Sequence, residues 1–139
     1  MILMGIAIKI SQIMTKEIIS VDSKALVSEA ASIMVRNEVG AVVVTKNSTP
    51  VGIITEVDVL KRCCIGKACN KELKAEDIMS AALITIDADA AIGEAARLMS
   101  DKRIRRLLVT ENEKIIGIVT EKDVLRATLG YFENVLLSI

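Results

Sequence analysis

The stretch GIITEVD at residues 52–58 returns at residues 117–123 as GIVTEKD. Working outward from this pair, residues 13–60 align with residues 78–125 without a gap. A unit this short rarely buries enough surface to fold alone, so two tandem copies indicate one pseudo-symmetric domain. Any site is then expected twice, where the two halves meet.

Composition narrows the class of protein. A chain of 139 residues is expected to form one domain, and its 52% hydrophobic content is ample for a core. Lys and Arg (18) balance Asp and Glu (18), and the chain has one Tyr, one Phe and no Trp. Nucleic-acid binding normally shows a basic excess and aromatic platforms, so we expect no nucleic-acid partner.

The first residues are apolar but do not predict a membrane segment. No apolar run approaches the roughly 18 residues of a spanning helix. No basic segment precedes residues 1–8, as it would in a signal peptide. Residues 1–12 are predicted to be an N-terminal arm that packs on its own domain or on a partner. The protein is predicted to be cytoplasmic, without membrane insertion.

Each repeat reads as strand, helix, strand, strand, helix, which gives an α+β (α/β) fold of tandem β-α-β-β-α units. A helical period between two strands predicts a crossover connection, and the last two strands form a hairpin. Asp22 or Ser23 is the expected N-cap of the first helix. In the first repeat the expected elements are a strand at 18–21, a helix at 25–37, strands at 41–45 and 51–54 around a polar turn at 46–50, and a helix from 55 to about 64.

The remaining segments complete the predicted organisation. Repeat 1 covers 13–64 and repeat 2 covers 78–127, joined by a linker at 65–77 whose end, 71–77, is a helical lead-in. Residues 128–139 are an apolar tail without a counterpart in the first repeat. This tail is expected to cover a sheet edge or to form a dimer contact.

The three cysteines, Cys63, Cys64 and Cys69, do not predict a metal site. Their number is odd, the chain has no His, and no C-x-x-C pair occurs. A structural zinc site normally has four nitrogen or sulfur ligands at recognisable spacing. We interpret these cysteines as small apolar side chains.

The element order, the repeat length and the doubled Gly-x-x-Thr-x-x-Asp motif resemble the cystathionine-β-synthase (CBS) domain family. Each motif follows a Val-Val-Val-Thr or Leu-Leu-Val-Thr strand and a turn, and the resemblance covers residues 13–126. In that family two repeats form one Bateman module, with two small sheets packed together, helices outside and two clefts. The resemblance implies a regulatory role and an adenosine ligand such as AMP, ADP, ATP or S-adenosylmethionine.

Thr55 with Asp58, and Thr120 with Asp123, have the spacing of a capping box at the start of a helix. Unpaired N–H groups and the helix dipole attract anions there, and a carboxylate can accept from both hydroxyls of a ribose. The resemblance implies that these four residues bind the ligand. The alternative is that they only cap their helices.

Further candidates come from the resemblance. Arg105 and Arg106 match basic residues that reach phosphate in family members, whereas repeat 1 has Gly40 and Ala41. The alternative is a solvated strand entry, and neighbouring residues on a strand face opposite sides. Ser20 and Thr85 match a hydroxyl-bearing position near the adenine, or belong to plain strand packing.

No catalytic constellation is visible: the chain has no His, no nucleophile with a base and no Gly-rich phosphate loop. We therefore predict that the protein is not an enzyme, and the resemblance implies a sensor that needs no cofactor and signals to a partner such as an enzyme or a transporter. One phosphate-binding cleft and one less basic cleft are expected. The alternative is a ligand-free assembly scaffold. Apolar helix faces that one small sheet cannot bury predict a homodimer.

Overall fold

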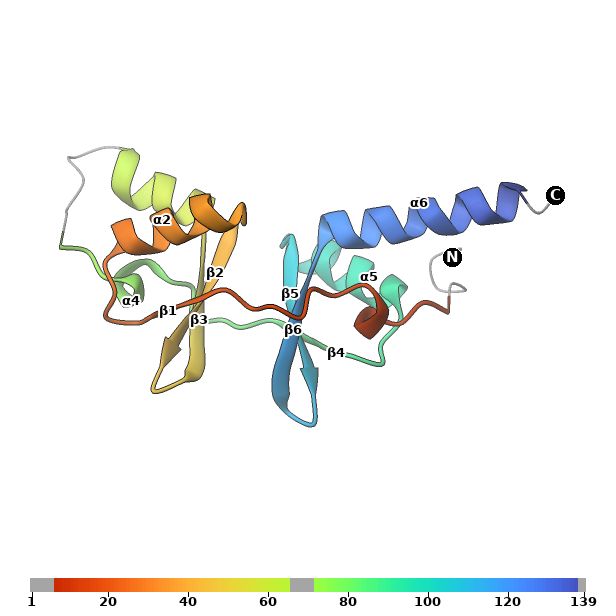
Figure 1. Ribbon diagram of the computed structural model, residues 1–139, viewed down its shortest axis with the longest axis horizontal. Coiled ribbons are helices and arrows are strands. Elements are labelled where there is room, and N and C mark those ends of the chain that lie inside the picture. The colour runs from red at the N-terminus through yellow and green to blue at the C-terminus, as the bar shows by residue number, and fades with distance from the viewer. Residues whose placement is uncertain (1–6, 66–71, 138–139) are drawn as a thin grey trace. The chain divides into compact units, whose positions relative to one another are not determined.

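The computed structural model describes residues 7–65 and 72–137. The chain divides into two compact units: Ile18–Leu83, and the residues up to Glu17 together with those from Ile84 onward. Each unit contains one three-stranded sheet with helices against it (Figure 1). The predicted β-α-β-β-α order is therefore confirmed in both repeats.

The first unit holds repeat 1. Strand β1 pairs parallel with β2, and β2 pairs antiparallel with β3, as a crossover followed by a hairpin requires. Its elements are β1 (Ser20–Asp22), α2 (Val27–Asn37), β2 (Ala41–Lys46), β3 (Thr49–Thr55), α3 (Glu56–Val59), the π-helical turn η2 (Leu60–Cys64) and α4 (Ala75–Ile78).

The second unit repeats this topology with sheet order β4-β5-β6. Its elements are the 3₁₀ turn η1 (Ile10–Gln12), β4 (Thr85–Asp87), α5 (Ile92–Lys102), β5 (Arg106–Glu111), β6 (Lys114–Thr120) and α6 (Glu121–Leu137).

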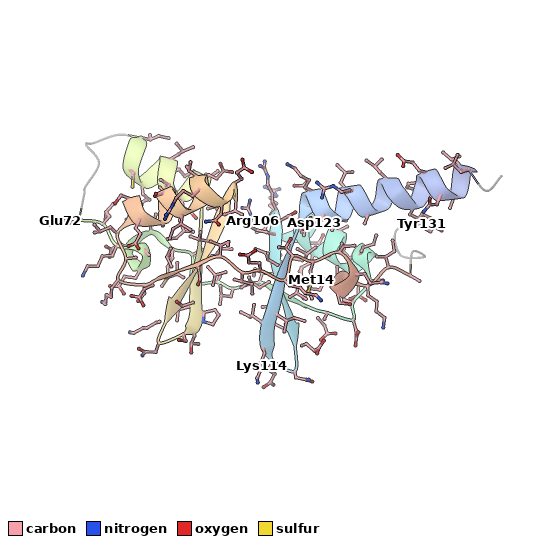
Figure 2. All side chains as sticks on the ribbon, in the orientation of Figure 1. Met14, Glu72, Arg106, Lys114, Asp123 and Tyr131 are labelled. Atoms are coloured by element: carbon pink, nitrogen blue, oxygen red, sulfur yellow. The ribbon has the colours of Figure 1, made fainter. Side chains whose placement is uncertain are left out.

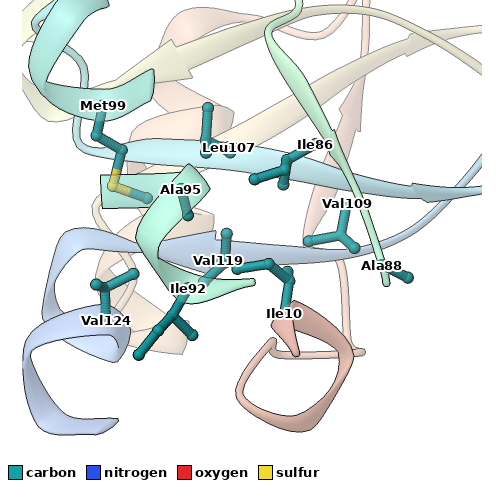
Figure 3. Close-up of a cluster of buried hydrophobic side chains, with 10 residues drawn as sticks. All are labelled: Ile10, Ile86, Ala88, Ile92, Ala95, Met99, Leu107, Val109, Val119 and Val124. Carbon is teal, nitrogen blue, oxygen red and sulfur yellow. The ribbon is translucent and has the colours of Figure 1, made fainter. Parts of the chain in front are cut away.

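Strand alternation decides which side chains meet the helices. In the second unit Leu107, Val109 and Val119 are almost fully buried and pack with Ala95 and Met99 of α5 (Figure 3). The first unit has the equivalent cluster on its own sheet, built around Val42, Val44 and Ile54. Alternate residues of the same strands face away from these helices. That second face carries the candidate site.

Two local predictions were wrong. The helix expected at 25–37 begins at Val27, and its N-cap is Leu26 without a side-chain cap. Asp22 instead accepts from the Lys24 N–H at 2.9 Å in a turn, and Ser23 is buried with its N–H donating to the Thr45 carbonyl. The residues before α2 are held by backbone bonds to other segments, so they cannot begin the helix.

The hairpin is also tighter than the predicted turn at 46–50. Only Asn47 and Ser48 lie between β2 and β3, both with positive φ (51° and 65°). Asn112 and Glu113 repeat this conformation at 52° and 65°. Positive φ at both central residues gives a two-residue turn that matches the right-handed twist of paired strands. The strands can therefore continue to Lys46 and start again at Thr49, although these polar residues were predicted to belong to the turn.

The segment before each repeat packs on the other repeat, which was not predicted. Helix α4 packs on repeat 1, where the Ala75 N–H donates to the Ala25 carbonyl at 2.7 Å. Residues 10–15 pack on repeat 2, where Ile10 is fully buried and Thr15 pairs with Ile118 through two 2.9 Å bonds. The described part of the N-terminal arm therefore packs within its own chain.

The predicted tail is the second half of α6, which runs without interruption from Glu121 to Leu137. Edge strand β6 of its unit is paired with Thr15, so the β6 edge is joined by the segment before repeat 1. Several of its large apolar side chains are exposed: Leu129, Tyr131, Phe132, Val135, Leu136 and Leu137.

Candidate functional site

The capping boxes predicted at the two Thr-x-x-Asp motifs are confirmed. Thr55 is the N-cap of α3; its N–H donates to Asp58 Oδ2 at 2.8 Å, and its Oγ1 accepts from the Asp58 N–H at 3.3 Å. Thr120 and Asp123 make the same two bonds at 2.9 Å and 3.2 Å. Each carboxylate is thus fixed at the point where a strand turns into a helix.

Capping uses only part of each carboxylate. The capping hydrogen bonds that Asp58 and Asp123 accept end on Oδ2 of each carboxylate. Oδ1 of each takes no part in these capping bonds, and both side chains are only partly buried. An ionised carboxylate accepts through both oxygens, so each motif can cap its helix and bind a hydroxyl together.

The sheet register places further candidates on the same face as each Thr. In repeat 1, Ala41 pairs with Thr55, while Ser20 and Ile53 flank Val43. Residues two apart on a strand share a face, so Ser20 and Thr55 lie on one side of the sheet, about 12 Å apart by standard strand spacings. In repeat 2 the same register joins Thr85 to the face of Thr120.

Arg105 and Arg106 lie on different sides of their sheet. Arg106 is the direct cross-strand partner of Thr120, so both side chains stand on the face away from the helices. Figure 2 shows Arg106 and Asp123 at the same end of this sheet. Arg105 instead lines a groove between α5 and α6 and lies 4.0 Å from Glu121. The structure therefore joins Arg106, but not Arg105, to the Thr120–Asp123 motif.

Repeat 1 has no such guanidinium. Ala41 occupies the position of Arg106 opposite Thr55. The two motifs thus share a hydroxyl and a carboxylate, and only the repeat 2 motif has a cation directly across the sheet. This difference lies within each unit and follows from strand register alone.

The residues that hold the two edge strands were missed by sequence reasoning. The Ser80 backbone pairs with Ile53 through bonds of 3.0 and 2.9 Å, matching the Thr15–Ile118 pair of the other unit. The available signal was a glycine inside each strand, Gly52 and Gly117. A strand glycine often marks a close backbone approach, and the approach here is that of Met79–Ser80 and Met14–Thr15.

The described residues contain neither a candidate metal site nor a candidate membrane-spanning helix. Within residues 7–65 and 72–137, no group of three or more Cys, Asp or Glu side chains could hold a metal ion. Cys63 is buried in the repeat 1 core, as the apolar interpretation requires, and Cys69 lies outside the described residues. No helix in the same ranges is long and apolar enough to cross a bilayer.

Comparison with known proteins decides the family. A family model for the CBS domain matches residues 10–64 and, a second time, residues 75–130. The chain belongs to the CBS domain family. Its fold agrees, since a solved CBS-domain protein of Burkholderia ambifaria superposes with a TM-score of 0.84 at 24% identity, over 88% of this chain and 95% of that one.

Two nearer relatives of this CBS-domain chain have no described function. An uncharacterized protein of Methanocaldococcus jannaschii is 32% identical over 136 residues, covering 91% of this chain and 73% of its own. A solved uncharacterized protein of Pyrococcus horikoshii is 32% identical with a TM-score of 0.80, covering 88% of this chain and 92% of that one.

A further solved neighbour carries ligands. The CBS domain pair of protein MJ0100, in complex with 5'-methylthioadenosine and S-adenosyl-L-methionine, matches with a TM-score of 0.80 at 26% identity, over 90% of this chain and 98% of that one. Other CBS-domain relatives are longer: the chain spans 31% of one uncharacterized M. jannaschii protein and 62% of one from Methanopyrus kandleri.

Proposed function

We propose that this CBS-domain chain is a cytoplasmic, non-catalytic sensor that binds an adenosine-containing nucleotide and signals its presence to a regulated enzyme or transporter. Thr120, Asp123, Arg106 and Thr85 form the primary site. Thr55, Asp58 and Ser20 form a second site without a cation across the sheet. AMP, ADP, ATP and S-adenosylmethionine are the candidate ligands.

The observation that carries this proposal is a carboxylate beside a helix start that caps the helix through only one of its two oxygens. Asp123 Oδ1 can accept a ribose hydroxyl while Oδ2 holds the cap. The N–H groups of Glu121 and Asp123 already donate to the Arg105 carbonyl and to Thr120 Oγ1, so a phosphate at the start of α6 would use the Lys122 N–H and the positive end of the helix dipole. Arg106 adds a charge-assisted donor from the neighbouring strand. The adenosine ligands of the MJ0100 domain pair support the same ligand class here.

Titration calorimetry tests the ligand class. Wild-type protein is titrated with AMP, ATP and S-adenosylmethionine, and with GMP as a control that keeps the ribose and phosphate but changes the base. We expect saturable binding of at least one adenosine ligand. Absence of heat with all of them at millimolar concentration would contradict the proposal and favour the scaffold alternative.

The two sites are expected to differ in their demand for phosphate. Arg106→Ala should weaken AMP binding at the primary site about tenfold, because a charge-assisted bond is lost, and should leave adenosine binding nearly unchanged. Ala41→Arg should strengthen AMP binding at the second site. Calorimetry at low and at high salt measures both effects, with Lys114→Ala, at the far end of β6, as the control.

Equal affinity of two AMP sites per chain, insensitive to Arg106→Ala, would overturn this assignment. Loss of adenosine binding together with AMP binding would also overturn it. In that case Arg106 would serve the fold of the site and not the phosphate.

A homodimer is proposed as the working state. Leu26, Leu60 and Leu125 are 43%, 53% and 59% exposed, and the second half of α6 adds further apolar surface. Exposed apolar area of this kind is usually covered by a partner. Multi-angle light scattering at micromolar concentration should give about twice the chain mass of 15.0 kDa. A mass of one chain would contradict the homodimer.

The same exposed surface favours the second candidate function, a ligand-free assembly scaffold. Calorimetry separates the two: a scaffold would associate without binding any adenosine ligand.

A further inference from the structure

The helix side of repeat 2 carries a groove that the nucleotide proposal does not use. It lies between α5 and α6, within one unit of the chain, and has a volume of about 530 Å³. Met99 and Val124, which belong to the core in Figure 3, line it together with Ala96, Ile104 and Leu125. Small-ligand sites typically measure about 300–1,000 Å³ and have mostly apolar walls. The groove therefore has the size and the lining of a site for a small molecule with an apolar body.

The hydroxyl groups in the lining do not oppose an apolar occupant. The Thr128 hydroxyl donates to the Val124 carbonyl of its own helix at 2.8 Å. An apolar ligand would therefore not leave it buried without a partner. Ser100 is an exposed residue of α5, so its hydroxyl can remain in contact with water beside a ligand.

Two guanidinium groups make the rim of the groove positive. Arg103 and Arg105 both line it and are both exposed. Within the part of the chain that the structure describes, Glu121 is the one acidic residue in the lining. It lies 4.0 Å from Arg105, but the two side chains are 68% and 80% exposed, and such an ion pair contributes little. A ligand carboxylate can replace it and gain charge-assisted, bidentate hydrogen bonds from a guanidinium.

Repeat 1 has different residues at the positions that give the groove its character. Alignment of the repeats sets Ser100, Arg103 and Arg105 opposite Val35, Glu38 and Gly40. Repeat 1 thus has an acidic residue and a glycine in place of the two cations. Val35 is 78% exposed, so a larger apolar side chain projects where repeat 2 has a serine. Both repeats have the same strand order and helices, so the fold itself does not require a basic groove.

We propose that the α5–α6 groove of repeat 2 binds a small amphiphilic anion, a free carboxylate with an unbranched apolar chain of about ten carbons. The chain lies over Met99 and Val124, and the carboxylate meets Arg103 and Arg105. The site is independent of the proposed nucleotide site, because the groove lies on the helix side of the sheet and Arg106 stands on the other side. Repeat 2 would thus recognise a second class of ligand.

Titration calorimetry at low salt tests the ligand class. The probes are decanoate, decanol and decyltrimethylammonium, which share one chain length and differ in charge, each below the concentration at which it forms micelles. We expect saturable binding of decanoate, and at least about tenfold weaker binding of the other two, because they lose or reverse the contact with the arginines. Octanoate should bind up to about fifteenfold more weakly than decanoate, since it buries a shorter chain.

Two variants with matched controls test the position of the site. Ser100→Trp fills the groove from an exposed position and should abolish decanoate binding, whereas Val35→Trp, at the equivalent position of α2, should not. Arg103→Glu should weaken binding at least about tenfold. It adds no backbone strain, because Glu38 already occupies the same left-handed C-cap in repeat 1, at φ 53° against 56°. Lys102→Glu makes the same charge change one residue outside the lining and is its control.

Circular dichroism checks that the four variants fold, and each should bind AMP as wild type does. No saturable heat with decanoate, or equal affinity for the anionic and cationic probes, would overturn the site. Full decanoate binding in Ser100→Trp and Arg103→Glu, or equal loss in their controls, would overturn it too. Leu125 of the lining also belongs to the apolar surface offered to the homodimer. Absence of decanoate binding together with weaker self-association of Ser100→Trp would therefore assign the groove to a second copy of the chain.

Discussion

Asp123→Ala is expected to weaken nucleotide binding at the primary site by about 1.5–3 kcal/mol, roughly tenfold to more than a hundredfold. The reason is that Oδ1 of this carboxylate is the acceptor proposed for the ribose hydroxyl. The substitution also removes the cap on Thr120, which should cost about 1 kcal/mol of folding stability. Asp58→Ala should have the same effects at the second site. Calorimetry and urea unfolding measure the two quantities separately.

Matched variants separate the cap from the ligand contact. Asp123→Asn keeps an oxygen that can accept the Thr120 N–H, so it should preserve most of the stability and still lose affinity. Asp77 caps α4 by the same bond, from the Lys74 N–H at 2.8 Å, without a Thr beside it. Asp77→Ala should therefore lose stability and leave binding intact. Wild-type affinity for every adenosine ligand in Asp123→Ala and Asp58→Ala together would refute the site.

Gly117→Ala is expected to destabilise the protein by about 2–3 kcal/mol. A Cβ at this position would stand 2.7 Å from Met14 Sδ and 2.9 Å from the Thr15 carbonyl oxygen. The carbonyl belongs to backbone that pairs with Ile118, so it cannot move without losing those two hydrogen bonds. Gly52→Ala should act similarly, because its Cβ would meet Met79 and, at 2.9 Å, the Ser80 carbonyl oxygen.

Gly130 provides the control for these substitutions. It lies inside α6 with nothing within 4 Å of an added Cβ, so Gly130→Ala should stabilise the protein by about 1 kcal/mol through helix propensity. Urea unfolding of the three variants measures the differences. A Gly117→Ala protein as stable as wild type would show that Met14–Thr15 does not dock on β6 as described.

The repeat, the strand order and the capping boxes were predictable because they depend on local patterns. Buried runs such as Val42–Val44 have the composition of a core strand, and Thr with Asp three residues later defines a helix start by itself. The alternation rule also predicted that Arg105 and Arg106 would face different sides. Which of them joins Thr120 depends on the β5–β6 register, which no local pattern states.

The exchange of Met14–Thr15 and Met79–Ser80 was not predictable in the same way. Each segment pairs with a strand far away in the sequence, and nothing in its own composition names that strand. The interior glycines Gly52 and Gly117 signalled a close approach but not its partner. The first helix begins two residues later than predicted for a related reason, since backbone bonds to residues 73–76 fix the chain before Val27.

The most direct test of the central claim is an amide chemical-shift titration of ¹⁵N-labelled protein with AMP. The account predicts that the largest shifts fall on the amides of Thr120, Glu121 and Lys122 and on the Arg106 side chain, with smaller shifts at Thr85. They should disappear in Asp123→Asn at the same AMP concentration. Shifts confined to other parts of the chain, or none at millimolar AMP, ATP and S-adenosylmethionine, would contradict the claim.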